Sequence, residues 1–125
     1  MFVDAHAHLC RNPSGLEKVA ACGRLEQVWL MDVGGCGLET NPFATEDEVL
    51  QAAVDFPGFF IPFGYLDLRR TPDEVDRLRD RGFFGLKAYR PEKPYDSPEY
   101  FPFYERAEAL GMPILFHTGI VEKCP

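Results

Sequence analysis

The sequence lacks a long apolar run, and none of its apolar stretches approaches the roughly 18 residues of a membrane-spanning helix. Its amino terminus also lacks a charged segment followed by an apolar signal core. Both absences argue against a membrane partner and against secretion. We therefore expect a cytoplasmic protein.

Basic clusters are absent as well. The 125 residues carry a formal net charge of -7 at pH 7, whereas nucleic-acid phosphates are bound by gathered Lys and Arg side chains. We therefore expect no nucleic-acid partner. A Gly-x-Gly-x-x-Gly motif is also missing after the first apolar run, so nothing supports a dinucleotide site. The glycine-rich residues 34–37 match that motif poorly and predict a flexible loop.

Cysteine is scarce, and its spacing is not that of a known framework. The four cysteines, at positions 10, 22, 36 and 124, form neither a zinc ribbon nor a disulfide pattern. Without a secretion signal, free thiols are favoured. Cys10 lies just beyond His8 and could face a site, although a small buried hydrophobe is the simpler interpretation.

Histidine is equally scarce, but its placement is informative. His6 and His8 lie in the apolar stretch 2–9 that opens the chain, and His117 ends the apolar run 113–117. On a strand, two residues span about 6.6 Å and share a face, so His6 and His8 point the same way. If both runs lie side by side in one parallel sheet, the three imidazoles emerge at its carboxyl edge.

Three convergent imidazoles are a metal-ligand set. Catalytic zinc takes three protein ligands and keeps a fourth position for water or substrate. His6, His8 and His117 therefore predict a divalent metal, with zinc favoured. The alternative is that each histidine is a hydrogen-bonded residue at a strand end, because a His-x-His pair also occurs by chance.

Apolar runs alternate with helix-like segments along the whole chain. Strands are predicted at five places, which are residues 2–8, 27–33, 59–66, 83–89 and 113–117. Helices are predicted between them, over residues 16–25, from Thr45, from Thr71 and from Ser97. Thr45 with Glu48, and Thr71 with Glu74, each predict a capping box. Pro62 weakens the third strand because proline lacks a ladder donor.

This order of strands and helices predicts an α/β protein with a parallel sheet, since the connections need right-handed crossovers. A (β/α)8 TIM barrel and a doubly wound sheet both have this rhythm. With 46% hydrophobic and 14% aromatic residues, the chain can bury a core. We expect one domain over residues 1–125.

Three segments in this order resemble the amidohydrolase-related (amidohydrolase 2) branch of the metal-dependent hydrolase superfamily. They are the opening Asp-x-His-x-His at Asp4, the run Arg81-Gly82-Phe83 with the strand Gly85-Leu86-Lys87, and Pro113-Ile114-Leu115-Phe116-His117-Thr118-Gly119. The resemblance implies a TIM-barrel enzyme with a divalent metal, usually zinc, held by His6, His8 and His117.

The resemblance also implies parts that this sequence does not contain. Family members add a histidine after strand six and an aspartate after strand eight, whereas the sequence given stops at Pro125 after about five β/α units. Five strands cannot close an eight-stranded barrel. We therefore expect residues 1–125 to be the amino-terminal part of a barrel. A missing carboxy-terminal portion or another chain would complete it, and a homo-oligomer would bring ten strands.

Four further side chains are candidates for the site. Lys87 and Asp4 are predicted to act in catalysis. Lys87 would be a buried amine that holds a substrate carboxylate, or would be carbamylated to bridge a second metal. Asp4 would be the hydrogen-bond partner of a ligand imidazole. Arg90 and Tyr89 follow the fourth strand and are predicted to bind an anionic substrate. The alternative for Lys87 is an ion pair with Asp4 or Asp32 in the core. Asp4 could instead be a purely structural hydrogen-bond acceptor, and Arg90 an ordinary surface arginine.

We expect a metal-dependent hydrolase that uses metal-activated water on an amide, lactone or other ester of a small molecule. Two other readings stay open. The first is a decarboxylase or hydratase of a small carboxylic acid on the same scaffold. The second is a non-catalytic fragment or subunit, and the chain alone could be inactive.

Overall fold

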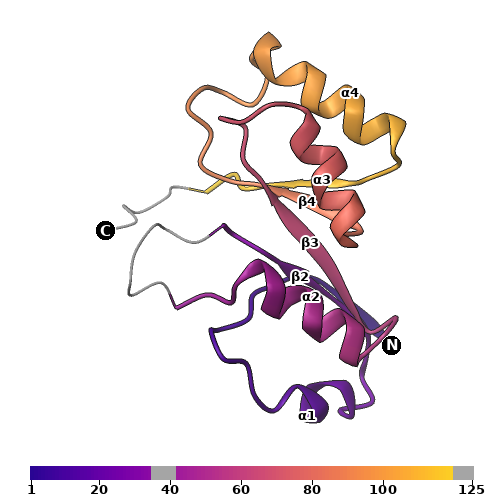
Figure 1. Cartoon of the computed structure of the whole chain (residues 1–125). Coiled ribbons are helices and arrows are strands. Elements are labelled where there is room, and N and C mark those ends of the chain that lie inside the picture. Colours follow the sequence, from indigo (N-terminus) through magenta and orange to yellow (C-terminus); the bar gives the residue numbers. More distant parts are fainter. Residues whose placement is uncertain (35–41, 120–125) are drawn as a thin grey trace.

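Strands and helices alternate along the chain as the apolar pattern predicts (Figure 1). The computed structural model describes residues 1–34 and 42–119. The strands are β1 (Phe2–Ala7), β2 (Leu25–Met31), β3 (Phe60–Leu66), β4 (Gly85–Ala88) and β5 (Ile114–Phe116). The helices are α1 (Leu16–Ala20), α2 (Glu46–Asp55), α3 (Asp73–Arg81) and α4 (Phe101–Ala109), with a 3-10 turn (Pro98–Tyr100) before α4. Cys36, Cys124 and most of the predicted glycine-rich loop lie outside the described residues.

The five strands form one parallel sheet in the order β1-β2-β3-β4-β5. The sheet curls into a half-barrel, which agrees with an incomplete TIM barrel. The predicted α/β architecture is therefore confirmed. One detail of the prediction was wrong: the strands that carry the histidines do not lie side by side, because β1 and β5 form the two opposite edges of the sheet.

The hydrophobic core lies between the sheet and the helices α2, α3 and α4. Alternate strand residues point toward the helices, as strand geometry requires. They pack against apolar faces spaced three and four residues apart along each helix. The most deeply buried members of this core are Leu30, Leu66, Val75, Leu78 and Leu86.

Pro62 lies inside a central strand, and its position explains why the strand tolerates it. Its carbonyl accepts a hydrogen bond from Phe84 N at 2.9 Å, so its missing N–H faces the β4 side. Pairing between β3 and β4 begins one residue later, at Phe63 and Gly85. The absent donor therefore falls just before the ladder, where it removes no strand hydrogen bond.

One of the two predicted capping boxes forms. Thr45 caps α2, since its side chain accepts from Glu48 N at 3.2 Å while the Glu48 carboxylate accepts from Thr45 N at 2.8 Å. The box predicted from Thr71 was wrong, because α3 has no side-chain cap. Glu74 turns instead toward Arg77, with which it pairs at 2.7 Å. The first predicted helix is also shorter than residues 16–25.

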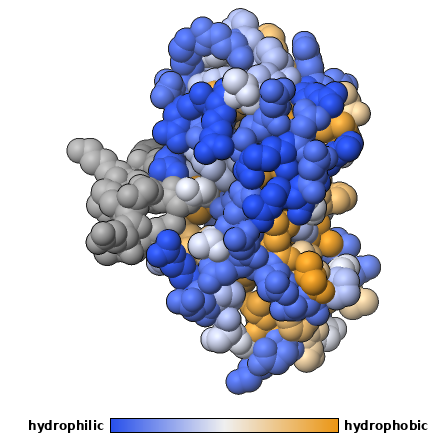
Figure 2. Space-filling model, viewed as in Figure 1, coloured by the Kyte–Doolittle hydropathy of each residue, from blue (hydrophilic) through white to orange (hydrophobic). Residues whose placement is uncertain are grey.

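Much of the surface in Figure 2 is hydrophilic, and hydrophobic residues gather toward the side where the amino terminus lies. Large exposed hydrophobics include Phe2 on β1, Val54 near the end of α2 and Phe84 just before β4. Five of the six β1 residues are exposed, as suits a strand at the edge of a sheet. Among the described residues, no helix is long and apolar enough to cross a membrane.

Candidate active site

The two histidines of the first strand converge as their spacing predicts. His6 lies in β1 and His8 follows it, and their Nε2 atoms are 3.1 Å apart. Two imidazoles on one tetrahedral zinc ion, each at about 2.0–2.1 Å, bring their nitrogens to about 3.3 Å. The two nitrogens are within hydrogen-bond distance of each other, and their separation is also close to that of two ligands of one ion.

The backbone fixes which nitrogen of His8 is available. His8 Nδ1 lies 3.3 Å from the carbonyl oxygen of Met31, at the end of β2. A carbonyl only accepts, so Nδ1 carries the proton and a neutral ring leaves its lone pair on Nε2. This is the second-nitrogen hydrogen bond that commonly orients metal-binding histidines.

His117 follows β5, and its ring packs edge-on against Tyr89 with ring centroids 4.9 Å apart. Its Nε2 atom is buried and has no hydrogen-bond partner among the described residues. A buried nitrogen without a partner is unfavourable unless a ligand or ion satisfies it. Burial is the main cause that lowers the pKa of His6 and of His8.

Lys87 on β4 supplies the fourth group of this cluster. Its side chain is only 1% exposed, and its Nζ atom lies 3.4 Å from His6 Nε2. Burial lowers the pKa of Lys87, and burial followed by the Lys87 charge lowers the pKa of His6. Among the described residues no carboxylate lies within ion-pair distance of Lys87. The alternative of a Lys87 paired with Asp4 or Asp32 is therefore not what the structure contains.

Asp4 lies near the same histidines but contacts the backbone. Its carboxylate accepts a hydrogen bond from His6 N at 3.1 Å, and its charge raises the pKa of His6 against the stronger lowering effects. The strand register is irregular between Asp4 and Ala7, which interrupts simple alternation. Asp4 thus supports the turn of the strand at His6 and does not bond to an imidazole.

The fit of a metal to this cluster is partial. In the described ranges, no three His, Cys, Asp or Glu side chains stand in a geometry that would hold an ion. The donor set is nevertheless suitable, because two imidazole nitrogens already converge and a third imidazole nearby has a buried nitrogen without a partner. Imidazole nitrogen is a preferred ligand of zinc, whereas manganese prefers oxygen ligands.

Arg90 and Tyr89 lie at the end of β4, as predicted. The Arg90 guanidinium lies over the rings of Tyr89 and Tyr65, at 5.0 and 5.8 Å from their centroids, and its Nη2 donates to Val33 O at 3.5 Å. Its backbone has φ 53°, a left-handed conformation that is uncommon outside glycine. Strain of this kind persists where surrounding contacts hold a side chain in a set position.

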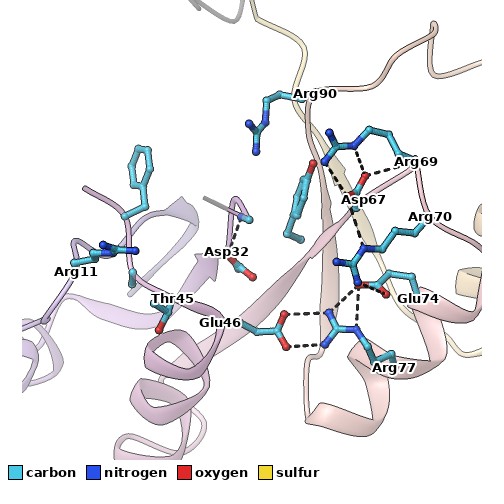
Figure 3. Close-up of a pocket in the computed structure, with 14 residues that line it drawn as sticks. Arg11, Asp32, Thr45, Glu46, Asp67, Arg69, Arg70, Glu74, Arg77 and Arg90 are labelled. Atoms are coloured by element: carbon cyan, nitrogen blue, oxygen red, sulfur yellow. Dashed lines mark hydrogen bonds and ion pairs between the residues drawn. The ribbon is translucent and has the colours of Figure 1, made fainter. Parts of the chain in front are cut away.

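A cavity among the described residues is lined by none of the three histidines and not by Lys87 (Figure 3). It has a volume of about 510 Å³ and is walled by the ends of β2, β3 and β4 and the first turns of α2 and α3. Five arginines and four carboxylates line it, which are Arg11, Arg69, Arg70, Arg77, Arg90, Asp32, Glu46, Asp67 and Glu74. We refer to this cavity as the arginine cleft.

The arginine cleft lies next to the histidine cluster, which consists of His6, His8, His117 and Lys87. The ring of Phe43, which lines the cleft, lies 5.4 Å from the ring of His8. On the other side, Arg90 lines the cleft and contacts Tyr89, whose ring packs on His117. We place the predicted chemistry at the histidines, because no imidazole lines the cleft.

Close packing shapes the floor of the cleft. Gly34 has φ +72°, and a Cβ there would lie 2.0 Å from the ring of Tyr65. Only glycine can follow β2 at this point and leave room for that ring. Asp32 is 4% exposed and accepts from Gly34 N at 2.9 Å. Burial raises the pKa of the Asp32 carboxyl, and the Gly34 N–H partly opposes this effect.

Apart from Arg90, the sequence did not single out the residues of this cleft as a binding site. Asp67, Arg69 and Arg70 follow β3, and only their position after a strand of a parallel sheet marks them. Arg11 and Phe43 come from two loops that a short antiparallel bridge between Cys10 and Phe43 brings together. Such long-range pairing leaves no local signal.

With the half-barrel and the histidine cluster established, a family model for amidohydrolases matches residues 38–124. This chain belongs to the amidohydrolase family, as the three sequence segments suggested. The match includes Lys87 and His117 but begins after His6 and His8. No curated protein sequence matches the chain.

Two solved structures have the same fold. One is a probable 2-pyrone-4,6-dicarboxylic acid hydrolase from Acinetobacter baumannii with citric acid bound, with a TM-score of 0.64 and 14% identity over 93% of this chain and 49% of that one. The other is a 5-carboxyvanillate decarboxylase from Novosphingobium aromaticivorans with bound manganese, with a TM-score of 0.56 and 18% identity over 74% of this chain and 31% of that one. The chain thus spans about half the length or less of these enzymes.

Proposed function

We propose that this chain is the metal-binding part of a metal-dependent hydrolase that acts on a small carboxylated molecule. His6, His8 and His117 would hold one divalent metal, with zinc favoured by three imidazole nitrogens. The observation that carries the proposal is the convergence of His6 Nε2 and His8 Nε2 at 3.1 Å, next to Lys87.

A bound divalent metal supplies two kinds of chemistry, a lowered pKa of water and polarisation of a carbonyl oxygen. The residues of this chain prepare the place for it. Met31 O holds His8 with its Nε2 lone pair directed at His6, and Asp4 holds the backbone at His6. The Met31 contact keeps the His8 imidazole in place before any ligand arrives, whereas the Asp4 contact fixes the backbone of His6.

Lys87 and Arg90 indicate that the substrate is negatively charged. Lys87 is buried next to His6 without a carboxylate, so an anionic group of the substrate would satisfy its ammonium. Arg90, supported by Tyr89, offers a planar fork for a second acid group. We therefore propose an amide, lactone or other ester that carries at least one carboxylate. Both structural neighbours are named for carboxylated compounds.

A decarboxylase is the second candidate function. A buried cation 3.4 Å from a predicted metal ligand would place a substrate carboxylate at the centre of the site, where its loss could occur. The neighbour from Novosphingobium aromaticivorans is named as a decarboxylase. Incubating a 2-pyrone dicarboxylate and a hydroxylated aromatic acid with the completed barrel distinguishes the two, since only the second reaction releases CO₂.

We propose that catalysis uses more of the barrel than residues 1–125. The edges formed by β1 and β5 present unpaired backbone groups, and further β/α units would cover them. We propose that a carboxy-terminal portion or another chain supplies these units, and that the substrate is a small molecule. A barrel completed by a second copy predicts a homo-oligomer in solution.

The metal is tested by native mass spectrometry of the 125-residue chain after zinc loading and desalting. We expect one zinc per chain in the wild type and none in His6→Asn. Cys10→Ser and Cys22→Ser are the controls, because these exposed thiols are the other soft donors of the described residues, and each should retain the ion. Zinc that survives His6→Asn and is lost from a cysteine variant would contradict the proposal.

A further inference from the structure

We propose that the arginine cleft binds a second anionic group of the substrate, held by Arg69 and Arg70 at the mouth of the cavity. This inference rests on the proposed function, because it assigns the distal end of the ligand whose reacting end lies at the histidines. The ligand class that follows is a small acid with two or more carboxylates, or with a carboxylate and a phosphate.

The charges around the cavity favour an anion. Five arginines and four carboxylates line it, which leaves one positive charge in excess in a chain whose net charge is -7. The carboxylates lie deep, whereas the guanidiniums of Arg69 and Arg70 are 53% and 61% exposed. A ligand that enters from the mouth therefore meets guanidinium first.

The deep carboxylates hold the arginines in position. Asp67 accepts from Nε and Nη2 of Arg69 at 2.8 and 2.9 Å, and Glu74 pairs with Arg70 at 3.4 Å (Figure 3). A guanidinium has five N–H donors, so these contacts orient Arg69 and leave donors for a second anion. Arg77 at the base is bound by both Glu46 and Glu74, at 2.9 and 2.7 Å, and completes a rigid wall.

The position of the cleft ties it to the histidines. The ring of Phe43, which lines the cleft, packs against the ring of His8. Arg90 reaches into the cleft from the end of β4 (Figure 3). A volume of about 510 Å³ is in the range of small-ligand sites and exceeds what one bound carboxylate needs. The proposed ligand extends from Arg69 and Arg70 past Phe43, with its other acid group near Lys87, and the Lys87→Met variant below tests this span.

The test measures binding to the metal-free 125-residue chain by isothermal titration calorimetry, with EDTA present. The probes are isophthalate, which has two carboxylates, benzoate, which has one, and inorganic phosphate. We expect isophthalate to bind at least about tenfold more tightly than benzoate. The double variant Arg69→Gln, Arg70→Gln should remove this preference, because each hydrogen bond to a charged group contributes about tenfold or more in affinity.

Two further variants test whether the loss of isophthalate binding is specific to Arg69 and Arg70. Arg79→Gln removes an exposed arginine of α3 outside the cleft and should change nothing. Asp67→Asn with Arg69→Gln avoids leaving a buried carboxylate unpaired, and circular dichroism checks its fold. An isophthalate affinity that is the same in the wild type and the double variant would overturn the proposal.

Lys87→Met separates a shared ligand from an independent anion site. Weaker isophthalate binding in this variant, with phosphate binding unchanged, supports a ligand that spans both places. Isophthalate binding unaffected by Lys87→Met, with phosphate bound equally tightly, would overturn the shared ligand. Zinc content measured on the same samples reports on the metal proposal separately.

Discussion

Gly85 illustrates how a single residue shapes the inner face of the sheet. The Phe63 ring lies over it and stacks on Trp29 with centroids 5.2 Å apart. A Cβ at position 85 would lie 2.4 Å from the Phe63 ring. We expect Gly85→Ala to lower the free energy of unfolding by about 1–3 kcal/mol through overpacking, as measured by urea unfolding.

A double variant provides the control for that prediction. In Gly85→Ala with Phe63→Leu, the smaller side chain makes room for the new methyl group, so the two changes should couple favourably. A double variant that loses the full sum of the two single effects would contradict the packing explanation.

Asp32 makes the stability of the fold depend on pH. Because burial raises its folded pKa above the ordinary value of 3.8, its contribution to stability is present at low pH and is lost as the pH rises through the folded pKa. We expect Asp32→Asn to unfold at higher urea than the wild type at pH 7. This gain should shrink as the pH falls toward 3.8. A gain that is equal at both pH values, or a loss at pH 7, would contradict the assignment.

Among the elements, α2 and α3 provide a matched comparison of helix caps. Thr45 makes a complete capping box, whereas the side chain of Thr71 makes no cap. Thr45→Ala should therefore lower the free energy of unfolding by about 1 kcal/mol. Thr71→Ala should change it by less than about 0.5 kcal/mol. Equal effects of the two changes in thermal unfolding would show that the caps are not as described.

The ion pairs between α2 and α3 form the strongest polar link between elements. Arg77 of α3 binds the buried Glu74 and reaches Glu46 of α2, and Arg81 pairs with Asp47. Removing Arg77 leaves the Glu74 carboxylate buried with less compensation, which is unfavourable. We expect Arg77→Met to lower the free energy of unfolding by about 1–3 kcal/mol, because Arg77 itself is partly exposed.

Arg79→Met is the matched control, since the one ion pair of Arg79 within residues 1–34 and 42–119 is with its exposed neighbour Asp80. Its effect should stay within about 0.5 kcal/mol. Adding Glu74→Gln to Arg77→Met should recover part of the loss, because it removes the stranded charge. Denaturant unfolding with no recovery would indicate that Arg77 acts through packing alone.

The elements could largely be predicted because their signals are local. Continuous apolar runs marked the five strands, and the Thr45–Glu48 spacing marked the start of α2. The box at Thr71 failed because Glu74 has a better partner in Arg77. A tertiary ion pair of this kind cannot be read from a four-residue motif.

At the scale of the whole molecule, the site depends on the curl of the sheet. The sequence predicted His6 and His8 on one face from their spacing alone, and this convergence is what the structure contains. It did not predict that β1 and β5 are opposite edges, or that loops after β2, β3 and β4 build the arginine cleft. Both features depend on how distant strands are placed, which no short motif encodes.

We propose that the three histidines of this half-barrel hold one metal ion. X-ray absorption of the zinc-loaded chain tests this proposal, because it counts imidazole and sulfur ligands around the ion. We expect three imidazoles in the wild type, and two in His117→Asn with zinc bound at least about tenfold more weakly. A wild-type ion with sulfur ligands, or with the same ligands in His117→Asn, would contradict it.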